Sequence, residues 1–528
     1  MARAAAETNS LPSQSSVHQS LAPQPSADGA GGLHPGWAPL RFALLALGTA
    51  VVLDALLLES GRPGLLSAAP RRLALDGVLA ALLFLAAQLL RHGARALLRP
   101  AGAFLVALAL FCANTRPLWS GDTEAAVLLP YALIRHQTFA LDEVACRGPQ
   151  APPMYAAVPG ERGRLWSRYP ILTGLLALPL ELPAALGHAD PCAPLGRDIE
   201  KVSAALLGAL IAALLSSALR ALVPELPAAL ALLCWLLGTA ALPVLGQALW
   251  QHTGAALGAA LAVRALCLPQ ARGQRVGLRA AMVGLGAGLV AACRPPDLPI
   301  ALALFWAFAR LEKHDQPAAR DRRANALRAL LAAALPLAIH IAYQWHAFGG
   351  PLRTGYGDEA IHGWSLAGFP LALAGLLVSP GRGLLVWSPI LLVALLPLVR
   401  AQPAPPASDP RAREHASNAA HFSYALFPFA LGLAAQLLLI ACWWAWHGGS
   451  SFGPRMHAGG LPLHAPLLAL AFAQLRTPRA KLAAALLALA SIVPNALVTY
   501  VPFPRERTEA ILHLRAPGGA WSGRAYPL

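Results

Sequence analysis

The stretch IEKVSAALLGALIAALLSSALRA, residues 199–221, consists mostly of alanine and leucine. A helix that crosses a bilayer needs roughly 20 consecutive, predominantly apolar residues, and this run is long enough. Similar runs recur along the 528-residue chain, of which 57% is hydrophobic and only 12% is charged. The sequence therefore predicts an all-α fold, a polytopic bundle of transmembrane helices.

About 13 spans are expected, together with one segment that enters the membrane without crossing it. The spans lie near 37–58, 73–91, 98–114, 199–221, 226–243, 247–266, 278–293, 296–310, 328–345, 382–399, 420–442, 460–474 and 480–500. The run at 170–187 contains Pro179 and Pro183, which should break a helix, so we interpret it as re-entrant. The apolar stretch at 364–378 suits a helix lying in the membrane interface.

Basic residues predict how the bundle is oriented. A formal net charge of +16 would suggest nucleic-acid binding in a soluble protein. Here the arginines cluster in short loops between apolar runs, so they indicate membrane orientation, and no nucleic acid is expected as a partner. The clearest basic loops are 268–279, 310–328, 400–413 and 475–481, which we assign to the cytoplasm.

Four regions follow from this scheme. Residues 1–36 are rich in Ser, Gln, Pro and Gly and should form a disordered cytoplasmic N-terminus. Two N-terminal transmembrane helices occupy 37–97, a transmembrane module with an external loop at 115–169 occupies 98–500, and residues 501–528 form an external tail. The seven cysteines are scattered without a C-x-x-C pair, so neither a metal cluster nor a disulfide framework is expected.

Acidic side chains stand out in the external loop. Asp122 and Glu124 follow Trp119, and Asp142 and Glu143 come later in the same loop. Carboxylates are costly inside hydrocarbon, so those in a membrane protein face water or serve a function. Asp122 could act as a general base with Glu124 assisting. Alternatively, Asp122 could simply cap a helix at 123–136, and Asp142 and Glu143 could be solvated or paired with Arg147.

A second polar group follows the span near 420–442. It reads WWAWHGGSSFGPR, residues 443–455. Its glycines allow close backbone approach to a ligand, and the planar guanidinium of Arg455 matches a phosphate. The tryptophans could contact sugar or isoprenoid, or could form an interfacial belt. A phosphate-bearing lipid is the ligand that this combination favours.

Several short motifs resemble a known family. They are WSRYP (166–170), LWQH (249–252), FGGPLRTGY (348–356), SPGRG (379–383) with WSP (387–389), and GGSSFGPR (448–455). In this order, within about residues 98–500, they resemble bacterial members of the C-type glycosyltransferase superfamily. That superfamily includes protein O-mannosyltransferases, lipid A aminoarabinose transferases and mycobacterial arabinosyltransferases. The chain departs from it in having two additional spans before the external loop and no large C-terminal soluble domain.

The resemblance implies transfer of a sugar, with inversion, from a polyprenyl-phosphate donor to a hydroxyl of a glycan, lipid or protein acceptor. The reaction would take place at the external face of the cytoplasmic membrane. Asp122 matches the family's general base, Glu124 completes an acidic pair, and the two could hold a divalent cation, Mg or Mn. The expected substrate and phosphate-binding residues are Arg455, Arg353, Arg168, Tyr169, Tyr356, Trp446 and His252. His252 could equally be a buried structural histidine.

Two other functions remain open from the sequence. A polytopic lipid or glycolipid transporter, or flippase, would distribute acids and bases through its spans. The polar clusters found here instead fall on one predicted face, and only Asp54 and Glu181 lie in or near apolar runs. Within one of these clusters, Asp297 is expected to pair with the nearby Arg294. A non-catalytic relative that acts as a membrane assembly protein is the third hypothesis.

Overall fold

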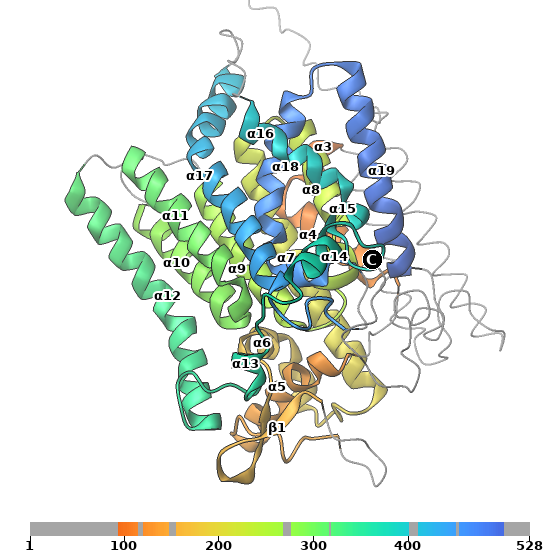
Figure 1. The fold of residues 1–528 in the computed structure, drawn as a ribbon, viewed down its shortest axis with the longest axis vertical. Coiled ribbons are helices and arrows are strands. Elements are labelled where there is room, and N and C mark those ends of the chain that lie inside the picture. The colour runs from red at the N-terminus through yellow and green to blue at the C-terminus, as the bar shows by residue number, and fades with distance from the viewer. Residues whose placement is uncertain are drawn as a thin grey trace, which may run out of the picture.

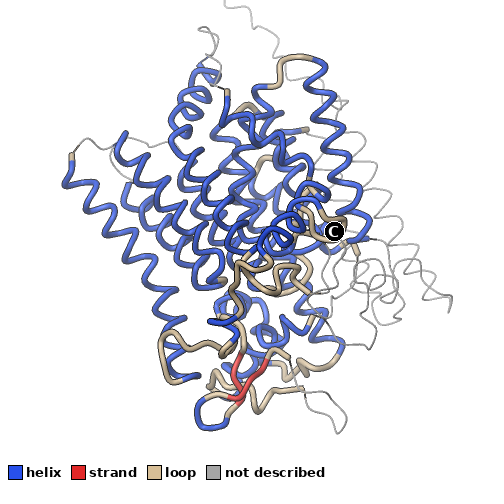
Figure 2. Tube along the Cα trace, in the orientation of Figure 1, coloured by secondary structure: helices blue, strands red, loops and turns tan. Residues whose placement is uncertain are grey.

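The computed structural model describes residues 93–114, 120–146, 155–267, 276–315, 318–400, 410–449 and 453–500, and helices make up 77% of them (Figures 1 and 2). Several expectations lie outside the described residues. These are the disordered segment 1–36, the spans near 37–58 and 73–91, Trp119, Arg147 and the tail 501–528.

The helices follow one another along the described residues, and the long segment between α5 and α6 contains a small β-hairpin. In the first part of the described chain they are α3 (Ala94–Leu97), α4 (Pro100–Cys112), α5 (Glu124–His136), α6 (Leu172–Leu186), α7 (Pro194–Leu222), α8 (Glu225–Leu237), α9 (Gln251–Cys267), α10 (Val276–Cys293) and α11 (Leu298–Asp315). The others are α12 (Ala319–Phe348), α13 (Glu359–His362), α14 (Phe369–Val378), α15 (Leu384–Trp387), α16 (Leu396–Val399), α17 (Pro410–Ala441), α18 (His464–Gln474) and α19 (Pro478–Tyr500).

Short irregular elements connect these helices. Tight 3-10 turns occur at Gly121–Thr123, Glu161–Gly163, Pro295–Asp297, Pro389–Leu395 and Arg455–Leu463, and a π-helical turn occurs at Ala241–Leu245. Strands β1 (Ala157–Pro159) and β2 (Leu165–Ser167) form an antiparallel hairpin, with Val158 opposite Trp166. This hairpin lies with α5 at the lower end of the molecule in Figure 1.

Within the described residues, six helices are long and apolar enough to cross a membrane. They are Leu195–Leu222, Val276–Cys293, Ala319–Phe348, Pro410–Ala441, Arg455–Gln474 and Pro478–Tyr500. The chain is therefore a mostly helical protein, and the length and composition of these helices indicate that it passes through a membrane several times.

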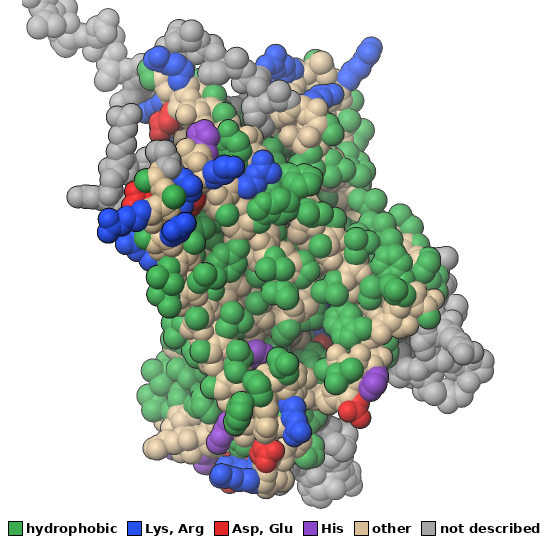
Figure 3. Space-filling model, turned by 60° about the vertical axis from the view of Figure 1, so that its left-hand side comes forward, with side chains coloured by type: hydrophobic (Ala, Val, Ile, Leu, Met, Phe, Trp, Pro, Cys, Tyr) green, Lys and Arg blue, Asp and Glu red, His purple; other side chains and the backbone are tan. Residues whose placement is uncertain are grey.

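The outer helices expose leucines that a soluble protein would bury. On α12, Leu327, Leu331 and Leu335 are exposed, and on α19 Leu482, Leu486 and Leu489 are exposed. Their spacing of three or four residues places each set along one face of its helix. Figure 3 shows the resulting broad hydrophobic surface. Such a surface is suited to contact with lipid.

The centre of the bundle is built around α7 and α9, which pack against one another and against α4, α8, α10 and α18. Small residues allow close packing between neighbouring helices. A Cβ added at Gly284 on α10 would lie 1.9 Å from the carbonyl oxygen of Ala329 on α12. Glycine at this position therefore permits contact between the two helix backbones.

Two local expectations were wrong. Segment 170–187 was expected to be broken by proline, yet α6 continues through Pro179 and Pro183. These prolines are four residues apart, so the missing backbone donors fall on one side of the helix. No disulfide framework was expected, yet Cys146 and Cys192 form a disulfide across 46 residues of sequence. Scattered cysteines gave no indication of this contact, because it depends on how α6 folds back onto the loop.

Candidate functional site

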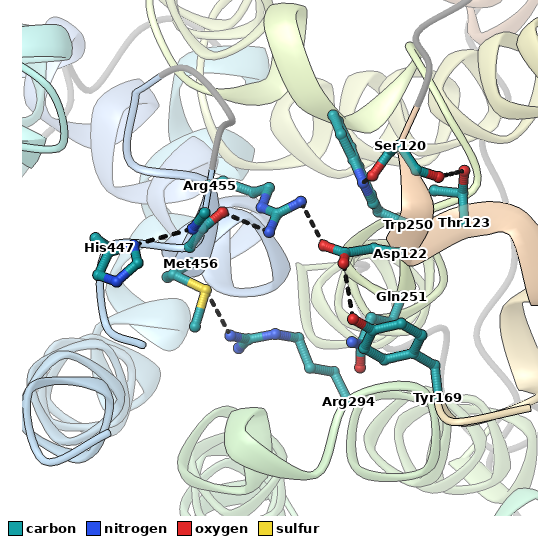
Figure 4. A network of polar contacts seen from close by, with 12 residues as sticks. Ser120, Asp122, Thr123, Tyr169, Trp250, Gln251, Arg294, His447, Arg455 and Met456 are labelled. Carbon is teal, nitrogen blue, oxygen red and sulfur yellow. Dashed lines mark hydrogen bonds and ion pairs between the residues drawn. The ribbon is translucent and has the colours of Figure 1, made fainter. Parts of the chain in front are cut away.

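Asp122 lies in the 3-10 turn that precedes α5 and holds two partners. Its Oδ1 accepts a hydrogen bond from the Tyr169 hydroxyl at 2.7 Å, and its Oδ2 lies 2.9 Å from Nη1 of Arg455 (Figure 4). One quarter of the carboxylate side chain is exposed. The helix cap of α5 is Thr123, and no side-chain hydrogen bond caps the helix, so Asp122 does not act as a cap.

Arg455 is fixed by contacts from three parts of the chain. Besides its ion pair with Asp122, its Nη2 donates to the carbonyl oxygen of Gly448 at 2.6 Å. Its Cζ lies 5.2 Å from the centre of the Trp250 ring, a cation–π arrangement. Trp250 in turn donates through Nε1 to the Ser120 hydroxyl at 3.0 Å. The guanidinium is therefore held in one orientation and is mostly buried.

The carbonyl that binds Arg455 belongs to a glycine with an unusual backbone. Gly448 has a φ of 70°, in the left-handed region that favours glycine. A Cβ there would also lie 3.2 Å from Cγ of Met456. The backbone conformation at Gly448 thus depends on the absence of a side chain.

A second buried guanidinium, that of Arg294, lies near the first. It forms an ion pair with Asp297, as the sequence predicted, and its Nη2 lies 3.5 Å from the Met456 sulfur. Figure 4 shows the guanidinium of Arg455 next to Asp122, and that of Arg294 close to the Met456 sulfur. Arg294 thus adds a second guanidinium near Arg455, and its charge is shared with Asp297.

Glu124 has an environment of its own at the start of α5. Its Oε1 lies 3.5 Å from Nη2 of Arg197, whose Nη1 donates to Glu200 at 3.1 Å. Burial raises the pKa of Glu124; the Arg197 charge opposes this, and the charges of Glu200 and Asp122 add to it. Asp122 and Glu124 are therefore near one another but face separate arginines.

The expected divalent cation would need ligands that converge. Among the described residues, Asp122 and Glu124 do not belong to any set of three His, Cys, Asp or Glu side chains close enough to share an ion. Each carboxylate instead has an arginine within ion-pair distance. The side chains present here fit guanidinium binding better than metal binding, and the Mg or Mn site stays a prediction.

Aromatic rings enclose Asp122 on the side of the β-hairpin. The Tyr169 ring meets that of Tyr356 edge to face at 5.6 Å, and Tyr356 meets Trp443 in the same way at 6.2 Å. Burial raises the pKa of Tyr169, and the charge of Asp122 raises it further. Burial likewise raises the pKa of Tyr356 to about 12. Both phenols therefore keep their protons, and Tyr169 is a donor to Asp122.

Arg168, the neighbour of Tyr169, is occupied by a different acid. It forms an ion pair with Glu359 on α13. Its Cζ also lies 4.8 Å from the Tyr155 ring centre and 5.4 Å from that of Tyr356. Arg168 thus supports the aromatic wall, and its charge is shared with Glu359.

The remaining expected residues lie in different surroundings. Arg353 is exposed in the loop after α12 and forms no ion pair with Asp122. Trp446 packs in the apolar cluster of α14 and α17 and contacts His447 edge to face. His252 is buried near Arg294 and Arg455, and its Nδ1 has no hydrogen-bond partner. The structure thus brings together Asp122, Tyr169 and Arg455, but not Arg353 or Trp446.

Sequence reasoning missed three contributors to this cluster. Arg294 was considered only as the partner of Asp297, Trp250 only as part of a motif, and Arg197 not at all. The available signal for Arg197 was its own position, close to the start of the long apolar run at 199–221. The later acid Asp142 is also partnered, because it accepts hydrogen bonds from Arg164 and from the backbone of Leu165.

Comparison of the chain with family models, with curated proteins and with solved structures finds no match.

Proposed function

We propose that this chain is a membrane glycosyltransferase that moves a sugar from a polyprenyl-phosphate donor to an acceptor hydroxyl, with inversion at the anomeric carbon. One observation carries the proposal. A solvent-accessible carboxylate, Asp122, directly contacts a nearly buried guanidinium, Arg455, from a distant part of the sequence. A base beside an anion-binding group is the pairing that this transfer needs.

In the proposed reaction the donor phosphate competes with Asp122 for Arg455. Phosphate oxygens and carboxylate oxygens bind a guanidinium in the same geometry. Binding of the donor would therefore release Asp122 Oδ2 from its ion pair. Oδ1 would keep the Tyr169 hydrogen bond, so the carboxylate would stay oriented while one oxygen became free to accept a proton.

In the proposed chemical step, Asp122 accepts the proton and Arg455 faces the departing phosphate. The acceptor oxygen attacks the anomeric carbon and forms the new glycosidic bond, while its proton passes to Asp122. The bond between the anomeric carbon and the phosphate oxygen breaks, and the electron pair leaves with the polyprenyl phosphate. Arg455, with Arg294 nearby, would stabilise the negative charge that gathers on that phosphate. Attack from the face opposite the leaving group gives inversion.

Two features support an external location for the site. The Cys146–Cys192 disulfide packs against the apolar cluster that contains Tyr169, and disulfides persist in oxidising compartments. Figure 3 shows Lys and Arg side chains gathered toward the other end of the molecule. Exposed basic residues there include Arg310, Lys313, Arg320, Arg323 and Arg328. Both features agree with a cytoplasmic basic end and an external Asp122.

The finer topology belongs to the same proposal. It has about 13 spans in the cytoplasmic membrane, a cytoplasmic N-terminus, an external tail and a non-crossing segment at 170–187. The six long apolar helices supply part of this count. Shorter apolar helices, such as α4 and α8, would complete it within the bundle.

The test uses purified protein, labelled polyprenyl-phosphate sugars and a membrane extract that supplies acceptors. Asp122→Asn should reduce transfer by about 10²-fold or more, because a general base is removed. Asp358→Asn is the matched control, since Asp358 is an exposed carboxylate in the loop after α12. Unchanged transfer in the Asp122 variant would reject the assignment of the base. Movement of lipid across the membrane without sugar transfer would favour a flippase.

A further inference from the structure

A separate polar cluster lies at the far end of α11. His314 and Asp315 end this helix, and His421 reaches them from α17. Nε2 of His421 is 2.6 Å from Asp315 Oδ1, and Nδ1 of His314 is 3.4 Å from the same oxygen. The three ligand atoms all lie within 4.8 Å of one another. The start of α11 adjoins Arg294 and Asp297, so the length of the helix separates this cluster from Asp122 (Figure 1).

Neighbouring side chains hold these ligands in place. Arg279 on α10 donates to the other carboxylate oxygen of Asp315 at 2.9 Å, which leaves Oδ1 toward the histidines. The ring of Tyr424 lies 4.8 Å from that of His314 at an angle of 36°, so the two rings partly stack. Metal-binding carboxylates and imidazoles are commonly oriented by such outer contacts.

An unpaired carboxylate oxygen beside the cluster is the second observation. Glu312 is 2% exposed, and it lies three residues before Asp315 on the same helix face. Its Oε2 accepts a hydrogen bond from Asn325, but its Oε1 has no hydrogen-bond partner. The charges of Arg279, Asp315 and His421 all act on Glu312. A buried oxygen without a partner is costly, and a cation would satisfy it.

We propose that His314, Asp315 and His421 bind a divalent transition-metal ion of the Zn²⁺ class, with Glu312 as a buried negative charge beside the site. Two imidazole nitrogens and a carboxylate suit Zn²⁺ and its neighbours in the transition series, whereas Mg²⁺ prefers oxygen ligands and water. Small movements of the side chains would bring the ligand atoms to the roughly 2.0–2.2 Å from a shared ion that zinc requires. The ion would join α11 to α17 and, through Arg279, to α10.

The full-length protein in detergent is first freed of metal with a chelator, and that chelator is then removed. Zn²⁺ binding is measured by competition with a second, chromophoric chelator. We expect one ion per chain in wild type, and at least about a tenfold loss of affinity in His314→Ala, because a direct ligand is lost. His314 is about half exposed, so its replacement should leave the fold intact. His421→Gln, which keeps a hydrogen-bonding side chain, should lose affinity in the same way.

Co²⁺ gives a direct readout of coordination. Wild type should develop a visible d–d absorption band on addition of Co²⁺, and both variants should lose it, whereas Mg²⁺ should not compete. His415→Ala is the matched control, because His415 lies on α17 outside the cluster and should bind as wild type. A wild type without the band, or cluster variants that bind Zn²⁺ as wild type does, would overturn the proposal. In that case the side chains act only as a hydrogen-bonded link between helices.

Discussion

At the scale of single residues, the contacts of Arg455 require a guanidinium group at this position. Its guanidinium touches a carboxylate, a carbonyl and an indole ring at the same time. A lysine ammonium is compact and could not keep all three contacts, since they rely on a planar group with several donors. The proposed phosphate site should therefore distinguish arginine from lysine.

We predict that Arg455→Lys lowers kcat/KM for the polyprenyl-phosphate donor by about 10–100-fold, a loss of about 1.4–2.7 kcal/mol of transition-state stabilisation. Steady-state assays with labelled donor would measure this. The exposed Arg162 provides the matched control as Arg162→Lys, which should retain wild-type kinetics. Equal rates for Arg455→Lys and wild type would show that the guanidinium does not bind the departing phosphate.

Gly448 offers a second test at the same scale. Gly448→Ala should lower the free energy of unfolding by about 1–2 kcal/mol, because φ is 70° and an L-residue is disfavoured there. Donor binding should also weaken, since the Gly448 carbonyl holds Arg455. Thermal unfolding and donor titration would measure the two effects. Gly368→Ala is the control, because a Cβ there meets nothing within 4 Å. Equal stability of the two variants would contradict the strain argument.

At the scale of secondary-structure elements, α10 and α12 depend on a close backbone approach. Gly284→Ala would place a Cβ 1.9 Å from the Ala329 carbonyl oxygen, so the helices must separate. We expect a loss of about 1–3 kcal/mol in stability, as for other overpacked positions. Gly277→Ala on the same helix is the control, because its nearest neighbour would be 3.5 Å away. Thermal unfolding in detergent would separate the two variants, and equal midpoints would refute the packing argument.

Elements were predictable where periodicity and length are strong. The apolar runs near 278–293, 328–345 and 480–500 all lie within helices of the structure. Prediction failed where local and tertiary preferences compete. Pro179 and Pro183 suggested a break, but the contacts of α6 with α5 and α7 keep the segment helical. The run near 382–399 was expected as one span, yet it consists of short α15, a 3-10 turn and α16.

The candidate site was predictable only in part, for a related reason. Asp122 and Arg455 were identifiable because charged side chains are rare in so apolar a chain. Arg294 was not assigned to the site, because its nearest acid in the sequence, Asp297, explained it locally. Trp446 and Arg353 were included because of their motifs. The directions of their side chains depend on how the helices pack, which the spacing of residues in the sequence does not predict.

At the scale of the whole molecule, the disulfide gives a way to determine which end faces outward. In a Cys112→Ser/Cys442→Ser background, the three other free cysteines are buried. We predict that a membrane-impermeant maleimide labels intact spheroplasts only after reduction, at Cys146 and Cys192, because the proposed orientation places these residues on the oxidising side. Adding Cys146→Ser and Cys192→Ser should abolish the labelling. Labelling that requires permeabilised membranes would reverse the proposed orientation.

The segment that begins with Arg455 is the most buried of the six candidate spans. An arginine on a surface loop could swing outward to meet an incoming anion, but one anchored at the start of a tightly packed helix cannot travel with it. The proposed lipid carrier would therefore have to present its head group at the depth where Arg455 already lies. Discrimination among carriers would then depend on how far below the membrane surface each one holds its charge.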